Sequence, residues 1–520
     1  MVWRDIEYIQ RLRASERGAL VRYWGGKLPV VLAYANSYAV GMSSLAIHSL
    51  YRWLNELPGV VCERTFAWLD KSNQSTGALL TLETQRPVAE AAVLAVSLSF
   101  ELDYLHLLAM LPRAGIPLRA IEREEGTPIV LLGGPAVSAN PEPLAILADA
   151  IVIGEIEPIL NDLVATIKGS WAEGRQTALH MLATIPGVYV PSLHQGQPIQ
   201  RQVQPTLDPY LVASSIYCPQ AEFGDMHLIE ISRGCEHACR FCLAGSWYLP
   251  LRERSLDQVI QQIKVGVKNG QRIGLVAAAV SDYSRLGELL DEAERLGARL
   301  SVSSLRVDSL SPKLLAALAT SGERTITLAP EAGSERLRQA IHKGVTEEDV
   351  HRAARLAAGY PFKTLKLYFM LGLPSETDDD MTELVKLARG VKQEFGRQVV
   401  VNITPFVPKA HTPWQRQAMA SAEVLNARLD WLKQAFSRER IVLRAGSVRE
   451  ALVQAILARG DRALGEVLVG SRYLTGTKLI HAMEEYNLDV ASYLRERPRD
   501  ELLPWHFIVN KGLDDSQRAK

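Results

Sequence analysis

Residues 226–242, MHLIEISRGCEHACRFC, join a short apolar run to three closely spaced cysteines. The run MHLIEIS is typical of a buried strand, and Cys235, Cys239 and Cys242 follow it in the spacing C-x3-C-x2-C. In one short loop this spacing lets three sulfurs converge on a metal centre. Three thiolates can hold a [4Fe–4S] cluster by three irons and leave the fourth iron open, much as catalytic zinc sites keep one open position. The stretch therefore predicts a reactive metal centre.

Two other interpretations of the cysteines stay open. A zinc ion could take the three cysteines together with His237 or His227, although structural zinc sites prefer two pairs of ligands. A conventional four-cysteine cluster would need Cys218 or Cys62 as a distant fourth ligand.

The composition is that of an ordinary globular protein. The 520 residues predict two or three domains. The 58 basic and 58 acidic residues leave no net charge that would favour nucleic acid, a membrane or acidic partners. The start MVWRDIEYIQRLR lacks the apolar region of a signal peptide, and no apolar run approaches the roughly 18–20 residues that cross a bilayer. Five cysteines, three of them clustered, do not form a secreted disulfide framework, so we expect a cytoplasmic protein.

The chain beyond the cysteines predicts an open barrel. Apolar runs alternate there with helical patterns such as SLDQVIQQIKVGVKNG. The candidate strands are MHLIEIS, RIGLVAAAV, RLSVSS, RTITLA, TLKLYFML and QVVVNIT. Six repeats are too few for a closed barrel and predict a partial (βα)6 TIM-type barrel over residues 226–417, with the cysteines at the carboxyl end where barrel active sites form.

A second α/β domain is expected over residues 29–185. The runs PVVLAYA, VVCERTF, AAVLAVS, PIVLLGG and DAIVIG are typical of strands buried on both faces of a parallel sheet. With amphipathic segments between them they predict a doubly wound, Rossmann-like fold, whose ligands bind at the carboxyl ends of the strands. We expect an N-terminal extension over 1–28, a linker over 186–225, and a helical C-terminal region with a polar tail over 418–520.

The cysteine spacing on a partial barrel resembles the signature of the radical S-adenosylmethionine (SAM) superfamily. The resemblance implies that the open iron chelates SAM, and that an electron from the cluster cleaves the sulfonium to a 5'-deoxyadenosyl radical. It also implies an electron donor such as a reduced flavodoxin or ferredoxin. The stretches PGVYVP, KLYFMLGLPSET and TPFVPKAHTPWQ resemble a largely uncharacterised subfamily whose barrel follows a cobalamin-binding-like domain.

The same resemblance implies SAM contacts at the carboxyl ends of the barrel strands. These are the adenine-bordering aromatic Phe241, the amino-binding Ser281 and Asp282, the ribose-binding Glu331, the carboxylate-binding Arg336, and Gly372 of the glycine-rich segment. As alternatives, Glu331 could cap a helix, and Arg336 could form a surface ion pair.

The N-terminal domain resembles cobalamin-binding domains, whose motif after the first strand is D-x-H-x-x-G. The histidine of that motif can replace the nucleotide base below cobalt. This chain has N-S-Y-A-V-G there, with Asn36, Tyr38 and Gly41, so the usual lower axial ligand is missing. Many radical enzymes of this branch also lack the histidine, and cobalamin binding in the base-off form stays implied.

Further cobalamin contacts are implied at the ends of the later strands: Ser97, Ser99, Gly133, Gly134, Gly154 and Glu155. Each glycine could instead serve only a tight turn. The domain could also have kept its fold and lost the cofactor.

The most specific hypothesis is a cobalamin-dependent radical methyltransferase acting on an unactivated carbon. The alternatives are a non-methylating radical enzyme, which carries out cyclisation, rearrangement or tRNA or protein modification, and a non-catalytic iron–sulfur electron-transfer or regulatory protein. No basic and aromatic strip indicates nucleic acid, and the substrate is not defined. His411 as a general base competes with a hydrogen-bonded structural role. Helix capping and core packing are the default for the RGDR and LPWH stretches, which contain Asp461, Arg462, Trp505 and His506.

Overall fold

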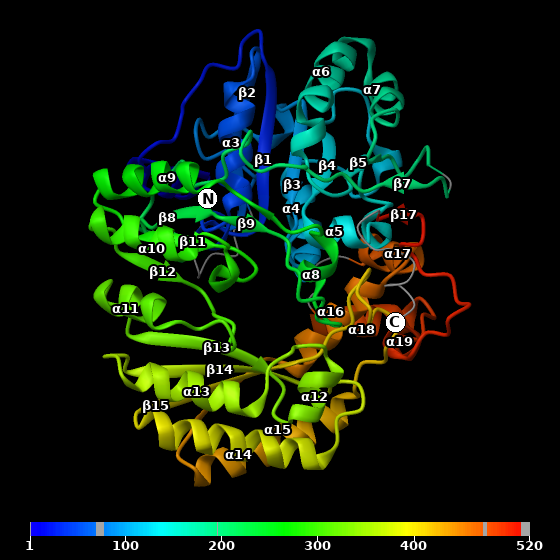
Figure 1. Ribbon diagram of the computed structural model, residues 1–520. Helices are drawn as coiled ribbons and strands as arrows, with labels where there is room; N and C mark the ends of the chain where they lie inside the picture. Colours follow the sequence, from blue (N-terminus) through cyan, green and yellow to red (C-terminus); the bar gives the residue numbers. More distant parts are fainter. Residues whose placement is uncertain (1, 69–76, 195, 472–475, 511–520) are drawn as a thin grey trace.

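The computed structural model describes residues 2–68, 77–194, 196–471 and 476–510. The predicted polar tail beyond residue 510 lies outside them. A parallel sheet with its helices forms the upper part of Figure 1, an open arc of strands and helices forms the left and lower parts, and the C-terminal helices lie at the right. Among the described helices, none has the length and apolar character needed to span a bilayer.

The N-terminal sheet contains the five predicted strands. They are β1 (Leu28–Ser37), β2 (Val60–Trp68), β3 (Val93–Ser97), β4 (Ile129–Gly133) and β5 (Ala150–Val152). Their order is β2-β1-β3-β4-β5 with parallel pairing throughout, and β6 (Val188–Tyr189) adds an antiparallel edge strand. This is the flavodoxin-like doubly wound order, whose topological switch point lies between β1 and β3. The predicted fold class is confirmed.

Helices cover both faces of this sheet, which is why its strands are almost continuously apolar. The helices are α1 (Val2–Ser15), α2 (Tyr38–Gly41), α3 (Leu45–Glu56), α4 (Asp103–Arg113), α5 (Pro135–Ala139), α6 (Leu160–Ser170) and α7 (Arg175–Leu182). Val31 and Leu94 pack into the core on one face, and Leu32 and Val93 pack into the core on the other.

The second domain is an open barrel of two parallel sheets. One contains β8 (His227–Glu230), β11 (Ile273–Val276) and β12 (Leu300–Val302), and the other contains β13 (Thr325–Glu331), β14 (Thr364–Leu371), β15 (Gln398–Pro405) and β16 (Val442–Ala445). A single bridge between Leu305 and Leu328 links the two sheets. All six predicted strands are present. The count of six is corrected to seven, because β16 continues the sheet beyond residue 417.

The larger barrel helices pack around one continuous core. They are α9 (Leu256–Lys268), α10 (Leu286–Arg295), α11 (Pro312–Thr320), α13 (Glu347–Ala358), α14 (Asp378–Phe395) and α15 (Ala422–Arg438). The short helices α8 (Leu243–Trp247) and α12 (Glu335–Ala340) contribute Trp247 and Leu337 to two other apolar clusters. Two short strands, β9 (Ser232–Arg233) and β10 (Arg252–Glu253), pair antiparallel and flank the cysteine loop.

The C-terminal helices pack against the N-terminal domain rather than forming a separate core. They are α16 (Val448–Arg459), α17 (Arg462–Gly470), α18 (Gly476–Glu485) and α19 (Val490–Leu494). Val453 and Val467 belong to the same apolar cluster as Leu107 of α4. In addition, β17 (Ile508–Val509) pairs with β7 (Ile199–Gln200) in the predicted linker. The end of the chain therefore holds the two domains together.

Candidate functional site

The cysteine loop is a tight connection between β9 and α8. Gly234 has φ +93°, and a Cβ there would lie 2.4 Å from the Tyr248 carbonyl oxygen, so only glycine fits. Cys242 is the N-cap of α8, and the Gly245 N–H donates to its Sγ at 3.4 Å. A helix N-terminus and a donated N–H both stabilise a thiolate.

The three thiols lie close enough to act on one another electrostatically. Burial raises the pKa of Cys239 to about 11, Lys343 and Arg306 oppose that rise, and Cys242 and Cys235 add to it. Burial also raises the pKa of Cys242. Metal binding requires thiolates and releases their protons. The two cations beside Cys239 favour the thiolate form that a cluster needs.

The alternative ligands have other surroundings or partners. Cys62 and Cys218 belong to the core of the N-terminal domain. His237, within the loop, has its Nε2 2.5 Å from Asp282 Oδ2, and His227 Nδ1 is 2.9 Å from the Tyr217 hydroxyl. Within the described ranges no three His, Cys, Asp or Glu side chains, the three loop cysteines included, are grouped as ligands of one ion. Binding of a [4Fe–4S] cluster by the three thiols, with one iron left open, stays a prediction.

Phe241 faces the carboxyl ends of the later barrel strands. It packs against an apolar cluster of Ala332, Leu337, Ile341, Met370, Leu373, Phe406 and Trp414. Met370 lies near the end of β14 and Phe406 directly follows β15. Apolar side chains thus lie immediately beside the cysteine loop.

Ser281 and Asp282 follow β11 and are connected to the cysteine loop. Asp282 contacts His237, which lies between the first two cysteines. The Ser309 hydroxyl donates to Ser281 Oγ at 2.7 Å. The structure therefore brings both residues to the loop, and their role toward SAM stays a prediction.

Glu331 ends β13 with φ +71°, an uncommon conformation for a residue with a Cβ. Its carboxylate accepts from Lys343 Nζ at 3.3 Å. Burial raises the pKa of Glu331, and Lys343 and Arg306 partly offset that rise. Ser334, not Glu331, caps helix α12. Lys343 and Arg306 were missed by the sequence analysis, because only the folded chain brings them beside Cys239.

Arg336 and Gly372 have contacts of their own. Arg336 is half exposed, pairs with Asp380 and donates to the Ser375 carbonyl oxygen at 2.8 Å. This is the surface ion pair named above as its alternative. Gly372 has φ +77°, and a Cβ there would lie 2.7 Å from Leu425 Cδ2. Its conformation and close packing account for the glycine, and both SAM contacts stay predictions.

The residues of the cobalamin-like motif, at the end of β1, have different surroundings. Asn36 Nδ2 donates to Asp103 Oδ1 at 2.7 Å near the carboxyl edge. Tyr38 is fully buried, and its hydroxyl donates to Glu16 at 2.8 Å. A Cβ on Gly41 would lie 2.5 Å from the Phe66 ring, so this glycine allows helix α2 to pack on β2.

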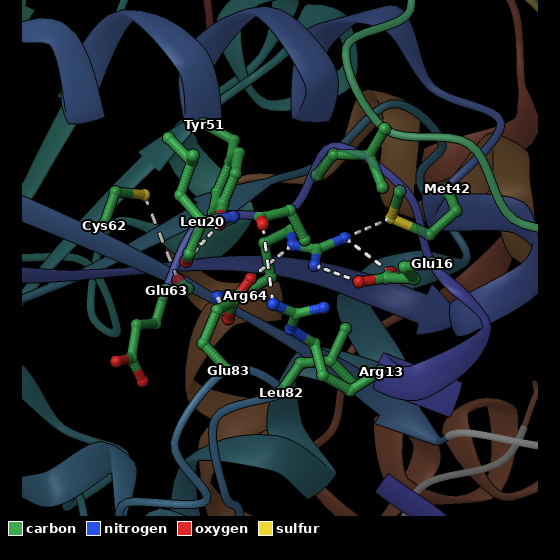
Figure 2. Close-up of polar contacts among 12 residues, drawn as sticks. Arg13, Glu16, Leu20, Met42, Tyr51, Cys62, Glu63, Arg64, Leu82 and Glu83 are labelled. Carbon is green, nitrogen blue, oxygen red and sulfur yellow. Dashed lines mark hydrogen bonds and ion pairs between the residues drawn. The ribbon is translucent and has the colours of Figure 1, made fainter. Parts of the chain in front are cut away.

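A buried charge cluster explains the position of Tyr38. Figure 2 shows Arg64 of β2 between Glu16 and Glu83, and both ion pairs are 2.7 Å long. All three side chains are inaccessible to solvent. Glu16 therefore binds Arg64 and Tyr38 together, and the aromatic side chain at the position of the missing histidine belongs to the core.

The residues at the ends of β3 and β4 differ in how closely the rest of the chain packs around them. Ser97 is buried, whereas Ser99 is exposed and hydrogen-bonds Tyr34. A Cβ on Gly134, with φ +108°, would lie 2.5 Å from the Leu98 carbonyl oxygen, so this glycine serves the packing of the chain. A Cβ on Gly133 would meet nothing within 4 Å. The backbone at Gly133 is therefore open to close approach by a ligand, and a cobalamin contact there stays a prediction.

Gly154 and Glu155 join the two domains. A Cβ on Gly154 would lie 2.3 Å from the Gln202 carbonyl oxygen. Glu155 is buried and accepts from Arg252 at 2.8 and 2.9 Å and from Arg233 at 2.9 Å. Burial alone would raise the pKa of Glu155, but the two arginines outweigh it and hold the pKa below its usual value. Its carboxylate is used by the barrel, and a cobalamin contact there stays a prediction.

Other contacts show that the carboxyl edges of the two sheets face each other. Glu101, which follows β3, pairs with Lys409, which follows β15, at 2.6 Å. His411 Nε2 lies 3.1 Å from the Ala139 carbonyl oxygen in the segment after β4, and the ring of His411 packs on Trp247 of α8. His411 therefore has the structural role named as the alternative to a general base. The strand-end rule could have identified Glu101, which lies in the SLSFE segment at the end of a predicted strand.

The C-terminal motifs also have structural roles, as expected by default. Asp461 caps α17, and Arg462 pairs with Glu142. Trp505 is buried and donates to Gln415 at 2.7 Å, while His506 contacts the Leu503 carbonyl oxygen.

Solved structures that align with this chain have low sequence identity and TM-scores below 0.5. The radical S-adenosylmethionine methyltransferase TsrM from Kitasatospora setae, with cobalamin and a [4Fe–4S] cluster bound, is 16% identical, with a TM-score of 0.49 and coverage of 73% of this chain and 72% of that chain. The cobalamin-dependent S-adenosylmethionine radical enzyme OxsB is 16% identical, with a TM-score of 0.48 and coverage of 70% and 52%.

Sequence relatives include proteins with assigned activities. The tRNA-2-methylthio-N(6)-dimethylallyladenosine synthase of Pelotomaculum thermopropionicum is 26% identical over 45% of this chain and 55% of its own length. The ribosomal protein uS12 methylthiotransferase RimO of Desulfotalea psychrophila is 25% identical over 53% of this chain and 65% of its own. These alignments span only part of each relative, 55% of the first and 65% of the second.

Two family descriptions match most of the region described above. Residues 46–191 match "Radical SAM proteins, N-terminal", and residues 229–388 match the "Radical SAM superfamily". The uncharacterized protein MJ0966 of Methanocaldococcus jannaschii is 31% identical over 467 residues, which is 88% of this chain and 94% of that protein. With three cysteines at the carboxyl end of a barrel strand, the chain belongs to the radical SAM superfamily.

Proposed function

We propose that this radical SAM enzyme is a cobalamin-dependent methyltransferase that modifies an unactivated carbon of its substrate. The observation that supports this most is that the carboxyl edges of the two parallel sheets face each other, as the contacts Glu101–Lys409 and His411–Ala139 show. Ligands of both fold types bind at that edge. A cofactor on one sheet would therefore lie opposite a cofactor on the other.

The residues at each edge suit different groups. Cys235, Cys239 and Cys242 would hold a [4Fe–4S] cluster and SAM, and the open backbone at Gly133 would receive cobalamin. When bound, the cluster supplies an electron that cleaves the sulfonium of SAM, and cobalamin carries the methyl group. A reduced flavodoxin or ferredoxin would renew the electron.

The chain's own side chains would bind and orient SAM. Lys343 and Arg306 are cations beside Cys239 and can neutralise a carboxylate. Asp282 and Glu331 can accept hydrogen bonds from an amino or hydroxyl group. Phe241 and its apolar cluster exclude water from one side of the loop, which protects a reactive radical from side reactions.

A second candidate is radical modification of tRNA or protein without cobalamin, such as methylthiolation. Its support is the similarity to the tRNA and ribosomal-protein methylthiotransferases. The burial of Tyr38 at the position of the missing histidine is compatible with it.

Anaerobic reconstitution with iron, sulfide and cobalamin separates the two candidates. For the methyltransferase we expect one retained corrinoid per chain, reductive cleavage of SAM, and transfer of a deuterated methyl group from labelled SAM to the corrinoid. Cleavage of SAM without retained corrinoid would favour the second candidate. A protein that binds no iron–sulfur cluster and leaves SAM intact would contradict both.

A further inference from the structure

His106 lies in the first turn of α4 and reaches back to the end of β1. Its Nδ1 is 2.9 Å from the Ala35 carbonyl oxygen and 3.5 Å from Asp103 Oδ1. A carbonyl oxygen only accepts hydrogen bonds, so Nδ1 carries the hydrogen. In the neutral ring Nε2 then has a free lone pair.

The Nε2 atom of His106 has no hydrogen-bond partner among the residues that the structure describes, and the side chain is 34% exposed. The ring packs edge-on against Trp68, which ends β2, with 4.6 Å between the ring centroids. The residues that it contacts through a carbonyl and a ring, Ala35 and Trp68, both lie toward the carboxyl ends of their strands. The free nitrogen therefore lies at the ligand-binding edge of the sheet, beside the β1/β3 switch point.

The surroundings of His106 match those of histidines that bind metals. Such a histidine usually donates its other ring N–H to a backbone carbonyl or a carboxylate, which fixes the tautomer and the orientation of the ring. His106 has the carbonyl of Ala35 and the buried carboxylate of Asp103 on that side. Asn36 in turn holds Asp103 at 2.7 Å.

His48, in the same domain, differs from His106 in the partners of its ring nitrogens. His48 is buried on α3, its Nε2 contacts the Met42 carbonyl oxygen, and its Nδ1 accepts from the backbone N–H groups of Ser215 and Ile216. Both of its ring nitrogens are used by the chain. In His106 only Nδ1 has a partner among the described residues, and Nε2 has none there.

We propose that His106 Nε2 is the axial ligand that the protein gives to cobalt when a corrinoid binds to this domain. The ligand would come from the segment after β3, whereas Tyr38, at the position of the histidine in the cobalamin-like motif, belongs to the core. The inference rests on the proposed binding of cobalamin.

Cob(II)inamide is the probe that tests it, because this corrinoid lacks the nucleotide base, so an axial nitrogen on cobalt, beyond the four of the corrin ring, must come from the protein. The reconstituted full chain is mixed with cob(II)inamide and measured by electron paramagnetic resonance. We expect a triplet splitting of the cobalt lines by one nitrogen-14 nucleus. Protein labelled with nitrogen-15 histidine should give a doublet, which identifies histidine without any substitution.

Variants then identify which histidine binds. His106→Ala should retain the cluster and lose the nitrogen splitting. His106→Gln is a second variant, since its amide can still donate to Ala35 if the alanine variant fails to fold. The matched control is His180→Ala on α7, because His180 Nδ1 also contacts a backbone carbonyl, at 2.8 Å, but on an exposed surface. The control should keep the splitting.

The outcomes separate this inference from the proposed function. If the chain binds neither cobinamide nor cobalamin, the proposed function fails and this inference fails with it. If a corrinoid binds with unsplit cobalt lines, or if the splitting persists without His106, the inference is wrong and cobalamin binding still stands.

Discussion

The carboxyl edges of the two sheets differ in how their chemical groups are gathered. At the barrel edge, residues 234–242 supply all three cysteines from one loop between β9 and α8. At the edge of the N-terminal sheet, the candidate groups come from separate strand ends, and one of them is the open backbone at Gly133. A cluster needs a fixed set of ligands, whereas a large organic cofactor needs room. The first requirement leaves a complete motif in this sequence, whereas the motif of cobalamin-binding domains is altered here at Asn36 and Tyr38.

The two edges also differ in charge where they meet. The N-terminal sheet contributes carboxylates, Glu101 and Glu155, and the barrel contributes the cations Lys409, Arg233 and Arg252. Because Glu155 and Arg252 are buried, the junction depends on paired charges and not on apolar contact alone. The following changes test each side of this comparison.

The largest effect is expected from Cys239→Ala at the barrel edge. Loss of one thiolate should prevent stable cluster binding and lower SAM cleavage by about 100-fold or more, since even changes behind a metal ligand cost about 10–100-fold. Iron and sulfide content and the formation of 5'-deoxyadenosine measure this. Cys62→Ala in the core of the other domain is the control and should keep the cluster. Equal iron content in both variants would show that the loop does not bind the cluster.

Glu155→Ala breaks the junction instead of the cluster. It leaves Arg233 and Arg252 with one buried carboxylate fewer, and should lower the free energy of unfolding by about 3–5 kcal/mol in denaturant titrations. The folded-state pKa of Glu155 lies below its unfolded value. Its stabilisation is therefore present above the ordinary carboxylate pKa and is lost as the pH falls through the lower, folded value.

An exposed ion pair provides the control for this junction. Glu288→Ala removes the partner of Arg285 on the surface of α10, and we expect no measurable change because solvent screens such pairs. A similar loss in both variants would mean that Glu155 contributes no more than a surface charge.

The buried residue His48 should make the stability of the N-terminal domain depend on pH. Burial lowers the pKa of His48 to about 4, while an unfolded histidine takes up a proton near pH 6.5. The unfolded state therefore binds more protons in this window, and stability should fall as the pH drops from about 6.5 to about 4, by about 3 kcal/mol for this group. His227, with its pKa also lowered to about 4, acts in the same direction. Urea titrations of His48→Gln should show a flatter pH profile, and an unchanged profile would exclude this role.

The sequence predicts the elements of both domains well, because their strands form apolar runs between turn residues. It also predicts the three cysteines, which are neighbours along the chain. It misses β16, because the side chains of Val442–Ala445 are largely exposed at the edge of the sheet and show no alternation of apolar and polar residues.

The parts that sequence patterns do not predict depend on long-range packing. Lys343 and Arg306 reach Cys239 from other loops, and Glu155 finds its arginines across the domain boundary. Tyr38 occupies the expected position in the motif, yet it points into the core because Glu16 and Arg64 form a charge cluster there. The position of a residue after a strand predicts where its backbone lies, but not the direction in which its side chain points.

Adjacent glycines at the end of β4 give the smallest and most specific test of the comparison. Gly134→Ala places a Cβ 2.5 Å from the Leu98 carbonyl oxygen at φ +108°, and should lower the free energy of unfolding by about 1–3 kcal/mol. Gly133→Ala adds a Cβ that meets nothing within 4 Å and should leave unfolding unchanged. If the open backbone receives the corrinoid, only Gly133→Ala should weaken cob(II)inamide binding at unchanged stability in absorption titrations. Tight binding by a stable Gly133→Ala protein would mean that the room at this edge is not used by the cofactor.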